Sequence, residues 1–105
     1  MKAICIKEPW VSMIVSGQKT IETRKWTTSY KGKLLICASK TPQSKLSGKA
    51  VAVVDLVDCR PMTKEDEKKA CCELYEGANA WILENIQQIT PVPIKGQLGL
   101  FDIQL

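Results

Sequence analysis

The most informative part of the chain is Gly17-Gln18-Lys19-Thr20-Ile21-Glu22-Thr23-Arg24-Lys25-Trp26. The glycine ends the apolar run before it, and residues 21–26 have the pattern of a strand. Side chains alternate between the two faces of a strand, so Glu22, Arg24 and Trp26 are expected to share one face. A carboxylate, a guanidinium and an indole side by side form a polar pocket with an aromatic wall. Such a pocket suits a base or another planar polar ligand better than a packed core.

Short strand-like segments dominate the chain on both sides of this stretch. Their apolar and β-branched composition predicts strands at residues 3–6, 21–26, 34–39, 50–59, 80–89 and 98–103. Residues 41–48 are expected to form a loop, and the proline-rich residues 90–96 a stiff connection.

Two helices are expected beside these strands. The first covers residues 9–16, with Pro9 in its first turn and Gly17 at its end. The second covers residues 64–76, preceded by a capping box formed by Thr63 and Asp66 and stopped by Gly77. About six strands and two helices predict a β-dominated α+β fold, a small closed β-barrel with helices at its openings.

Length and charge restrict the class of protein only broadly. The 105 residues are expected to form a single domain spanning 1–105. The chain has 15 basic and 11 acidic residues, a net charge of +4. This charge is compatible with a polyanionic partner, RNA or also DNA, but many small domains with no nucleic-acid function carry a similar excess.

Cysteine and histidine usage narrows the chemistry further. The five cysteines are odd in number and lack CxxC spacing, which predicts a reducing, cytoplasmic location and no disulfide framework. Histidine is absent, which excludes Ser-His-Asp and Cys-His catalysis and zinc sites that use imidazole. No metal or cofactor is expected. No membrane span is expected either, because no apolar run approaches the roughly 20 residues that a span needs.

The expected pocket has the chemistry of a nucleotide site. Lys19 and Arg24 supply two cations, and an arginine can hold a phosphate through its planar fork. Trp26 or Trp10 could stack on a base, and Glu22 could accept a hydrogen bond from an exocyclic amine. We expect the ligand-binding set to be completed by Ser39 and Lys40. Further lysines could extend the positive surface toward flanking phosphates: Lys31, Lys33, Lys45 and Lys49.

A purely structural interpretation of the same residues stays open. Glu22 and Arg24 could form an ion pair that steadies the mouth of the barrel. Trp10 and Trp26 could be ordinary core residues, with no contact to a ligand.

Several motifs together resemble the ASCH domain family. They are Pro9-Trp10-x-Ser12, Gly17-x-Lys19-x-x-Glu22-x-Arg24-x-Trp26, Tyr30-x-Gly32-x-Leu34-x-Ile36-x-Ala38-Ser39, Val54-Asp55-Leu56-Val57-Asp58-Cys59 and Pro93-Ile94-Lys95-Gly96. The resemblance implies a PUA-like β-barrel whose two helices flank a cleft. Lys19, Glu22 and Arg24 would line this cleft, and the partner would be RNA, a modified nucleoside or a protein of the coactivator kind.

The resemblance also implies two activities besides binding. Small relatives include an amidohydrolase of N4-acetylcytidine, and others are ribonucleases, so a small hydrolase with Lys19 and Glu22 as catalytic residues is the alternative to binding. In the amidohydrolase branch a threonine, the expected nucleophile, stands where this chain has Glu22. Thr20 and Thr23 flank that position, but Thr23 is expected to point away from Glu22. A third alternative is a protein-interaction module of the coactivator type.

Overall fold

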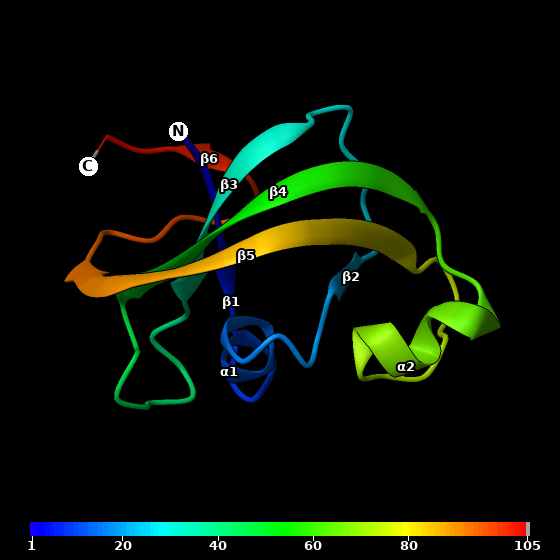
Figure 1. Cartoon of the computed structure of the whole chain (residues 1–105), viewed down its shortest axis with the longest axis horizontal. Helices are drawn as coiled ribbons and strands as arrows, with labels where there is room; N and C mark the ends of the chain where they lie inside the picture. Colours follow the sequence, from blue (N-terminus) through cyan, green and yellow to red (C-terminus); the bar gives the residue numbers. More distant parts are fainter. Residues whose placement is uncertain (105) are drawn as a thin grey trace.

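A single six-stranded sheet forms the centre of the molecule in the computed structural model, which describes residues 1–104 (Figure 1). The strands are β1 (Lys2–Ile6), β2 (Ile21–Arg24), β3 (Gly32–Ala38), β4 (Lys49–Pro61), β5 (Asn79–Pro93) and β6 (Phe101–Asp102). They are ordered β2-β5-β4-β3-β1-β6, and every neighbouring pair is antiparallel except β1 with β3. The predicted β-dominated α+β fold is therefore confirmed.

The two longest strands give the sheet its curvature. β4 and β5 have 13 and 15 residues, and the register between them shifts at three places. Such irregularities bend a strand and increase its twist. Asn85 lies within β5 and has a positive φ of 54°, which is unusual for a strand residue. As a result β4 and β5 form an arch above α1, β2 and α2 in the view of Figure 1.

The main core lies between the sheet and the short helix α1 (Trp10–Val15). Val11 and Ile14 are completely buried on one side of this helix. They pack with sheet residues that include Ile4, Ile6, Leu34, Ile36, Val54, Leu56, Trp81 and Leu83. The burial of these two residues fixes the segment that follows α1, which carries Lys19 toward the functional cleft.

The predicted closure of the sheet into a barrel is wrong. β2 and β6 are the two edges of the sheet, and within residues 1–104 they do not pair with each other. β2 has only four residues and β6 only two, too few to build a closing ladder. The open side of the sheet between β2 and β1, which we call the seam, is bridged by a side chain instead. Arg24 Nη2 on β2 donates a hydrogen bond to the carbonyl of Cys5 on β1, at 2.9 Å.

The second predicted helix is much shorter than residues 64–76. A 3₁₀ turn (Lys64–Asp66) leads into α2 (Glu67–Ala70), and the helix ends because Cys71 adopts a left-handed conformation with φ 56°. The capping box of Thr63 and Asp66 is confirmed. Gly77 is not the stop of the helix; it lies in the turn before β5.

Three other predicted boundaries differ from the structure. β2 ends at Arg24 and does not reach Trp26, while the last strand is limited to Phe101–Asp102. The expected connection at residues 90–96 is partly strand, because β5 continues to Pro93. Prolines are tolerated there because β2 pairs with β5 only as far as Ile82, so one side of β5 has no neighbour in the sheet. Among the described residues, no helix is long and apolar enough to cross a membrane.

Candidate nucleotide-binding cleft

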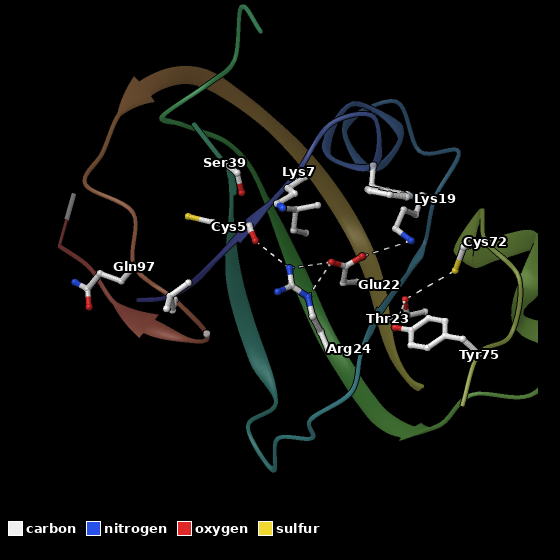
Figure 2. Close-up of a pocket in the computed structure, with 14 residues that line it drawn as sticks. Cys5, Lys7, Lys19, Glu22, Thr23, Arg24, Ser39, Cys72, Tyr75 and Gln97 are labelled. Atoms are coloured by element: carbon white, nitrogen blue, oxygen red, sulfur yellow. Dashed lines mark hydrogen bonds and ion pairs between the residues drawn. The ribbon is translucent and has the colours of Figure 1, made fainter. Parts of the chain in front are cut away.

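A cleft of about 540 Å³ lies at the open seam of the sheet, between β1 and β2 (Figure 2). Its walls come from these two strands, from α1, from the segment after α2 and from the loop before β6. The lining residues are Cys5, Ile6, Lys7, Trp10, Lys19, Glu22, Thr23, Arg24, Ser39, Cys72, Tyr75, Gln97, Leu98 and Gly99. The site therefore lies between the edge strand β2 and the part of β1, Cys5 and Ile6, that does not pair with β6.

Lys19 is buried at the base of this cleft. Gly17, with φ 86°, turns the chain after α1, and the Lys19 backbone N–H donates to the carbonyl of Met13 at 3.0 Å. The side chain is only 1% exposed. Its Nζ donates to the carbonyl of Ala70 at the end of α2, and it lies 3.4 Å from Glu22 Oε1. The carbonyls of Met13 in α1 and Ala70 in α2, together with the Glu22 carboxylate, thus hold this lysine.

Glu22 and Arg24 extend the same chain of charges toward β1. Arg24 Nε donates to Glu22 Oε2 at 3.1 Å, and Arg24 Nη2 lies 3.0 Å from the same oxygen. The ion pair expected between these two residues is therefore present. With the bond to the Cys5 carbonyl, the series Lys19, Glu22, Arg24 crosses the seam from α2 to β1 (Figure 2).

The tryptophans differ from their predicted positions. Trp10 lines the cleft and is 38% exposed. Trp26 is 39% exposed but is not among the lining residues, because β2 ends at Arg24 and its alternation stops there. Trp26 instead packs edge to face on Trp81, with ring centroids 4.8 Å apart. The core interpretation of Trp10 and Trp26 is wrong, since the fully buried tryptophan is Trp81.

The two residues after β3 separate in the structure. Ser39 lines the cleft, and its backbone N–H donates to the carbonyl of Ile6 at 2.9 Å. Lys40 is exposed, lies outside the lining and packs near Gly48. Of the predicted ligand-binding residues, the structure thus brings together Trp10, Lys19, Glu22, Arg24 and Ser39.

A polar wall opposite β1 was missed from the sequence. Thr23 lines the cleft together with Glu22, although strand alternation predicted that it would point away. Both residues can border the cleft because β2 is an edge strand. Tyr75 donates a hydrogen bond from its hydroxyl to Thr23 Oγ1 at 2.9 Å, and Cys72 Sγ lies 3.8 Å from that oxygen. An exposed tyrosine shortly before Gly77 was the available signal, but the overlong helix prediction concealed it.

The loop before β6 closes the other end of the cleft against Cys5. A Cβ on Gly96 would lie 2.9 Å from Cys5 Sγ, so a larger residue does not fit there. Hydrogen bonds from the Cys37 thiol and the Gln97 backbone, with the nearby charge of Arg24, lower the pKa of Cys5 to about 7. The pKa of Cys37 is raised by its bond to Cys5 and by burial.

The lining suits an organic ligand better than a metal ion. Within residues 1–104, no group of three or more histidine, cysteine or acidic side chains is arranged to hold a metal. Apolar and aromatic walls surround a small number of charged groups, an arrangement typical of sites for small organic molecules, and the volume lies in the usual range for such sites.

Comparisons with known proteins agree on one family. The family model of the ASCH domain matches residues 4–93. The crystal structure of an ASCH protein from Zymomonas mobilis superposes with a TM-score of 0.75 at 17% identity, covering 98% of this chain and 87% of that one. A variant of the same protein gives a TM-score of 0.72 at 16% identity, covering 98% of this chain and 89% of that one.

Two curated relatives match over most of this chain but little of their own length. Activating signal cointegrator 1 from Homo sapiens is 25% identical in an alignment 121 positions long, which covers 89% of this chain and 20% of that protein. The Mus musculus protein of the same name is 25% identical over 119 residues with the same coverage. The chain thus spans about a fifth of the length of these relatives.

Proposed function

Because the chain belongs to the ASCH domain family, we propose that its cleft binds RNA or a modified nucleoside. At the coarser level, membership in this family and the cointegrator relatives support interaction with nucleic acid or protein. The finer proposal assigns the ligand to the seam between β1 and β2. Lys19, Glu22 and Arg24 form the base of this site, and Trp10 supplies a stacking wall.

The observation that carries the proposal is the buried chain of charges at the base of a cleft with aromatic edges. A lysine that is 1% exposed and an arginine share one carboxylate there. Trp10 and Tyr75 lie at the rim, and both keep more than a third of their surface exposed. Unstacked bases are usually held by aromatic side chains and polar groups in this combination. A cleft of about 540 Å³ has room for a single nucleoside.

Fluorescence anisotropy with a short unstructured RNA, at low and physiological salt, tests this proposal. Trp10→Ala should weaken binding by about tenfold or more if the indole stacks on a base. Trp26→Ala is the matched control, because Trp26 has nearly the same exposure but lies outside the lining. Each protein is first melted to show that it is folded. Equal losses for the two variants, or no binding by the wild type, would contradict the RNA proposal.

Salt separates nucleic acid from a protein partner. Binding of single-stranded RNA should weaken with a slope of about −0.7 per phosphate contact on a logarithmic scale. A protein held by an apolar surface should respond much less to salt. If the chain binds a partner protein with an affinity that hardly changes with salt, the interaction-module alternative is favoured.

Hydrolysis of an N4-acylated cytidine or of RNA is the second candidate, and one observation favours it. The hydroxyl of Thr23 lies in the cleft and not on the far face of β2, bonded to Tyr75 and next to Glu22 in the chain. A hydroxyl needs a base and an oxyanion donor before it can attack an amide. Turnover of N4-acetylcytidine that Thr23→Val removes, while nucleoside binding persists, would establish this activity. A wild type that is inert on such substrates would end it.

A further inference from the structure

Two cationic side chains of the protein lie against the Glu22 carboxylate at the base of the cleft. Its Oε1 is 3.4 Å from Lys19 Nζ, and its Oε2 receives both Arg24 Nε and Arg24 Nη2, at 3.1 and 3.0 Å. Both oxygens are therefore engaged by cations of the protein itself. If an amine of a ligand approached this carboxylate, the N–H donors of the amine would meet three N–H groups of the protein that already point at the same oxygens.

The Arg24 guanidinium keeps one donor group that the described residues do not use. Arg24 Nη1 has no acceptor within hydrogen-bonding distance among residues 1–104, whereas Nε and Nη2 are occupied. Figure 2 shows this free end of the guanidinium turned away from Glu22, toward the side of the cleft where Gln97 lies. Because the fork of Nε and Nη2 is already used by Glu22, only the Nη1 end can meet a ligand.

The charges of the lining are not balanced. Lys7, Lys19 and Arg24 stand against a single carboxylate, Glu22, and Cys5 adds a negative charge when its thiol, with a pKa of about 7, ionises. The described lining therefore carries an excess of one to two positive charges near neutral pH. The Lys7 side chain is exposed and has no ion-pair partner within the described residues. Such an excess favours an anionic group over a neutral or cationic one.

From these contacts we infer that the ligand presents a phosphate to the Nη1 end of Arg24, with Lys7 as the second cation, and that Glu22 only positions Lys19 and Arg24. This inference rests on the proposed function, and it replaces the expectation that Glu22 reads an exocyclic amine. A terminal phosphate monoester and an internal phosphodiester share the required chemistry.

Calorimetric titration at low salt tests this inference with defined probes. The probes are the four ribonucleosides, their 5′-monophosphates, a dinucleotide with one internal phosphodiester, and inorganic phosphate. At least one monophosphate should bind about ten- to a hundredfold more tightly than its nucleoside, the usual gain for a charged hydrogen bond. The dinucleotide identifies the source: equal gains for monoester and dinucleotide would assign the site to an internal phosphate of a strand.

Variants show whether the gain comes from the named groups. Arg24→Gln should remove the gain from the phosphate, so that the variant binds a monophosphate and its nucleoside with similar affinity. Arg24→Gln also breaks the bond to Cys5, so a second variant is needed. Lys7→Gln serves because the Lys7 side chain forms no ion pair within the described residues, and it should lower the affinity for the monophosphate by about three- to tenfold. Lys64→Gln is the matched control, because Lys64 is exposed and lies outside the lining.

The outcomes separate the two levels of the proposal. If nucleosides bind as tightly as their monophosphates, the phosphate inference is overturned and nucleoside binding stands. If monophosphates bind no more tightly than inorganic phosphate, the cleft is an anion site and the proposed nucleoside function fails. If no probe binds, both fail.

Discussion

Replacing Glu22 by glutamine is the perturbation whose effect can be worked out most directly from the structure. The change preserves the size of the side chain but removes the carboxylate that lies beside Lys19. Lys19 is 1% exposed, so its charge would remain buried without a counter-ion, which typically costs about 3–5 kcal/mol. Arg24 is 25% exposed and can regain water, so it should add little to this cost. A loss of about 3 kcal/mol corresponds to roughly 12–24 °C in the melting temperature of a domain of this size.

Urea denaturation at neutral pH measures this loss, with Lys19→Met as the comparison. Lys19→Met leaves Glu22 paired with Arg24, so it should cost less than Glu22→Gln. The double variant should be more stable than Glu22→Gln alone, because it removes the buried charge that the single variant leaves unpaired.

A small effect would refute the reasoning. If Glu22→Gln lowers the free energy of unfolding by less than about 1 kcal/mol, the ion pair behaves like an exposed one and the lysine is not dependent on it. A double variant less stable than Glu22→Gln would contradict the buried-charge explanation as well.

Three further predictions concern other parts of the fold. Since the pKa of Cys5 is lowered to about 7, its alkylation by iodoacetamide, followed by mass spectrometry at each pH, should reach half its maximal rate near pH 7; a midpoint near the ordinary thiol value would contradict this. Gly96→Ala should lower the free energy of unfolding by about 1–3 kcal/mol, because its Cβ would lie 2.9 Å from Cys5 Sγ, and an unchanged urea midpoint would show that the loop simply shifts. Arg60 donates two hydrogen bonds to Asp66 and holds the pKa of that carboxyl well below its usual range, so Asp66→Asn should cost about 1.5–3 kcal/mol at neutral pH. The charge of Asp66 stabilises the fold above about pH 4, the usual pKa of an aspartate in an unfolded chain. This contribution should fade as the pH falls further, in the wild type but not in Asp66→Asn.

Local patterns in the sequence predicted the parts of the fold that depend on neighbouring residues. Alternation and β-branched residues identified the strands, and Gly17 correctly marked the end of the first helix. The spacing of Glu22 and Arg24 placed their side chains within reach of each other, as the 3.1 Å hydrogen bond shows. These features follow from the period of a strand and the conformational freedom of glycine, which act over a few residues.

The missed features depend on contacts between distant segments. Tyr75 reaches Thr23 across 52 positions, and Arg24 reaches Cys5 across 19. The end of α2 was also hidden, because a cysteine, and not a glycine, takes the left-handed conformation at position 71. Whether the sheet closes depends on the lengths of its edge strands, and those lengths are fixed by tertiary packing. Local patterns therefore identified Lys19, Glu22, Arg24 and Trp10 in the cleft, but not Lys7 or the wall formed by Thr23, Cys72 and Tyr75.

A two-dimensional ¹H–¹⁵N NMR titration of the wild type with cytidine 5′-monophosphate, and then with a short single-stranded RNA, tests the central claim most directly. The chain has three tryptophans, whose indole N–H signals report separately on the cleft, its neighbourhood and the core. We expect the largest shifts at the Trp10 indole and at the backbone amides from Lys19 to Arg24, together with those of the adjacent Cys5 and Lys7. Shifts confined to a second pocket, lined by residues that include Pro61, Met62, Leu74 and Gly77, or no shifts with either ligand, would contradict a nucleotide site at the seam.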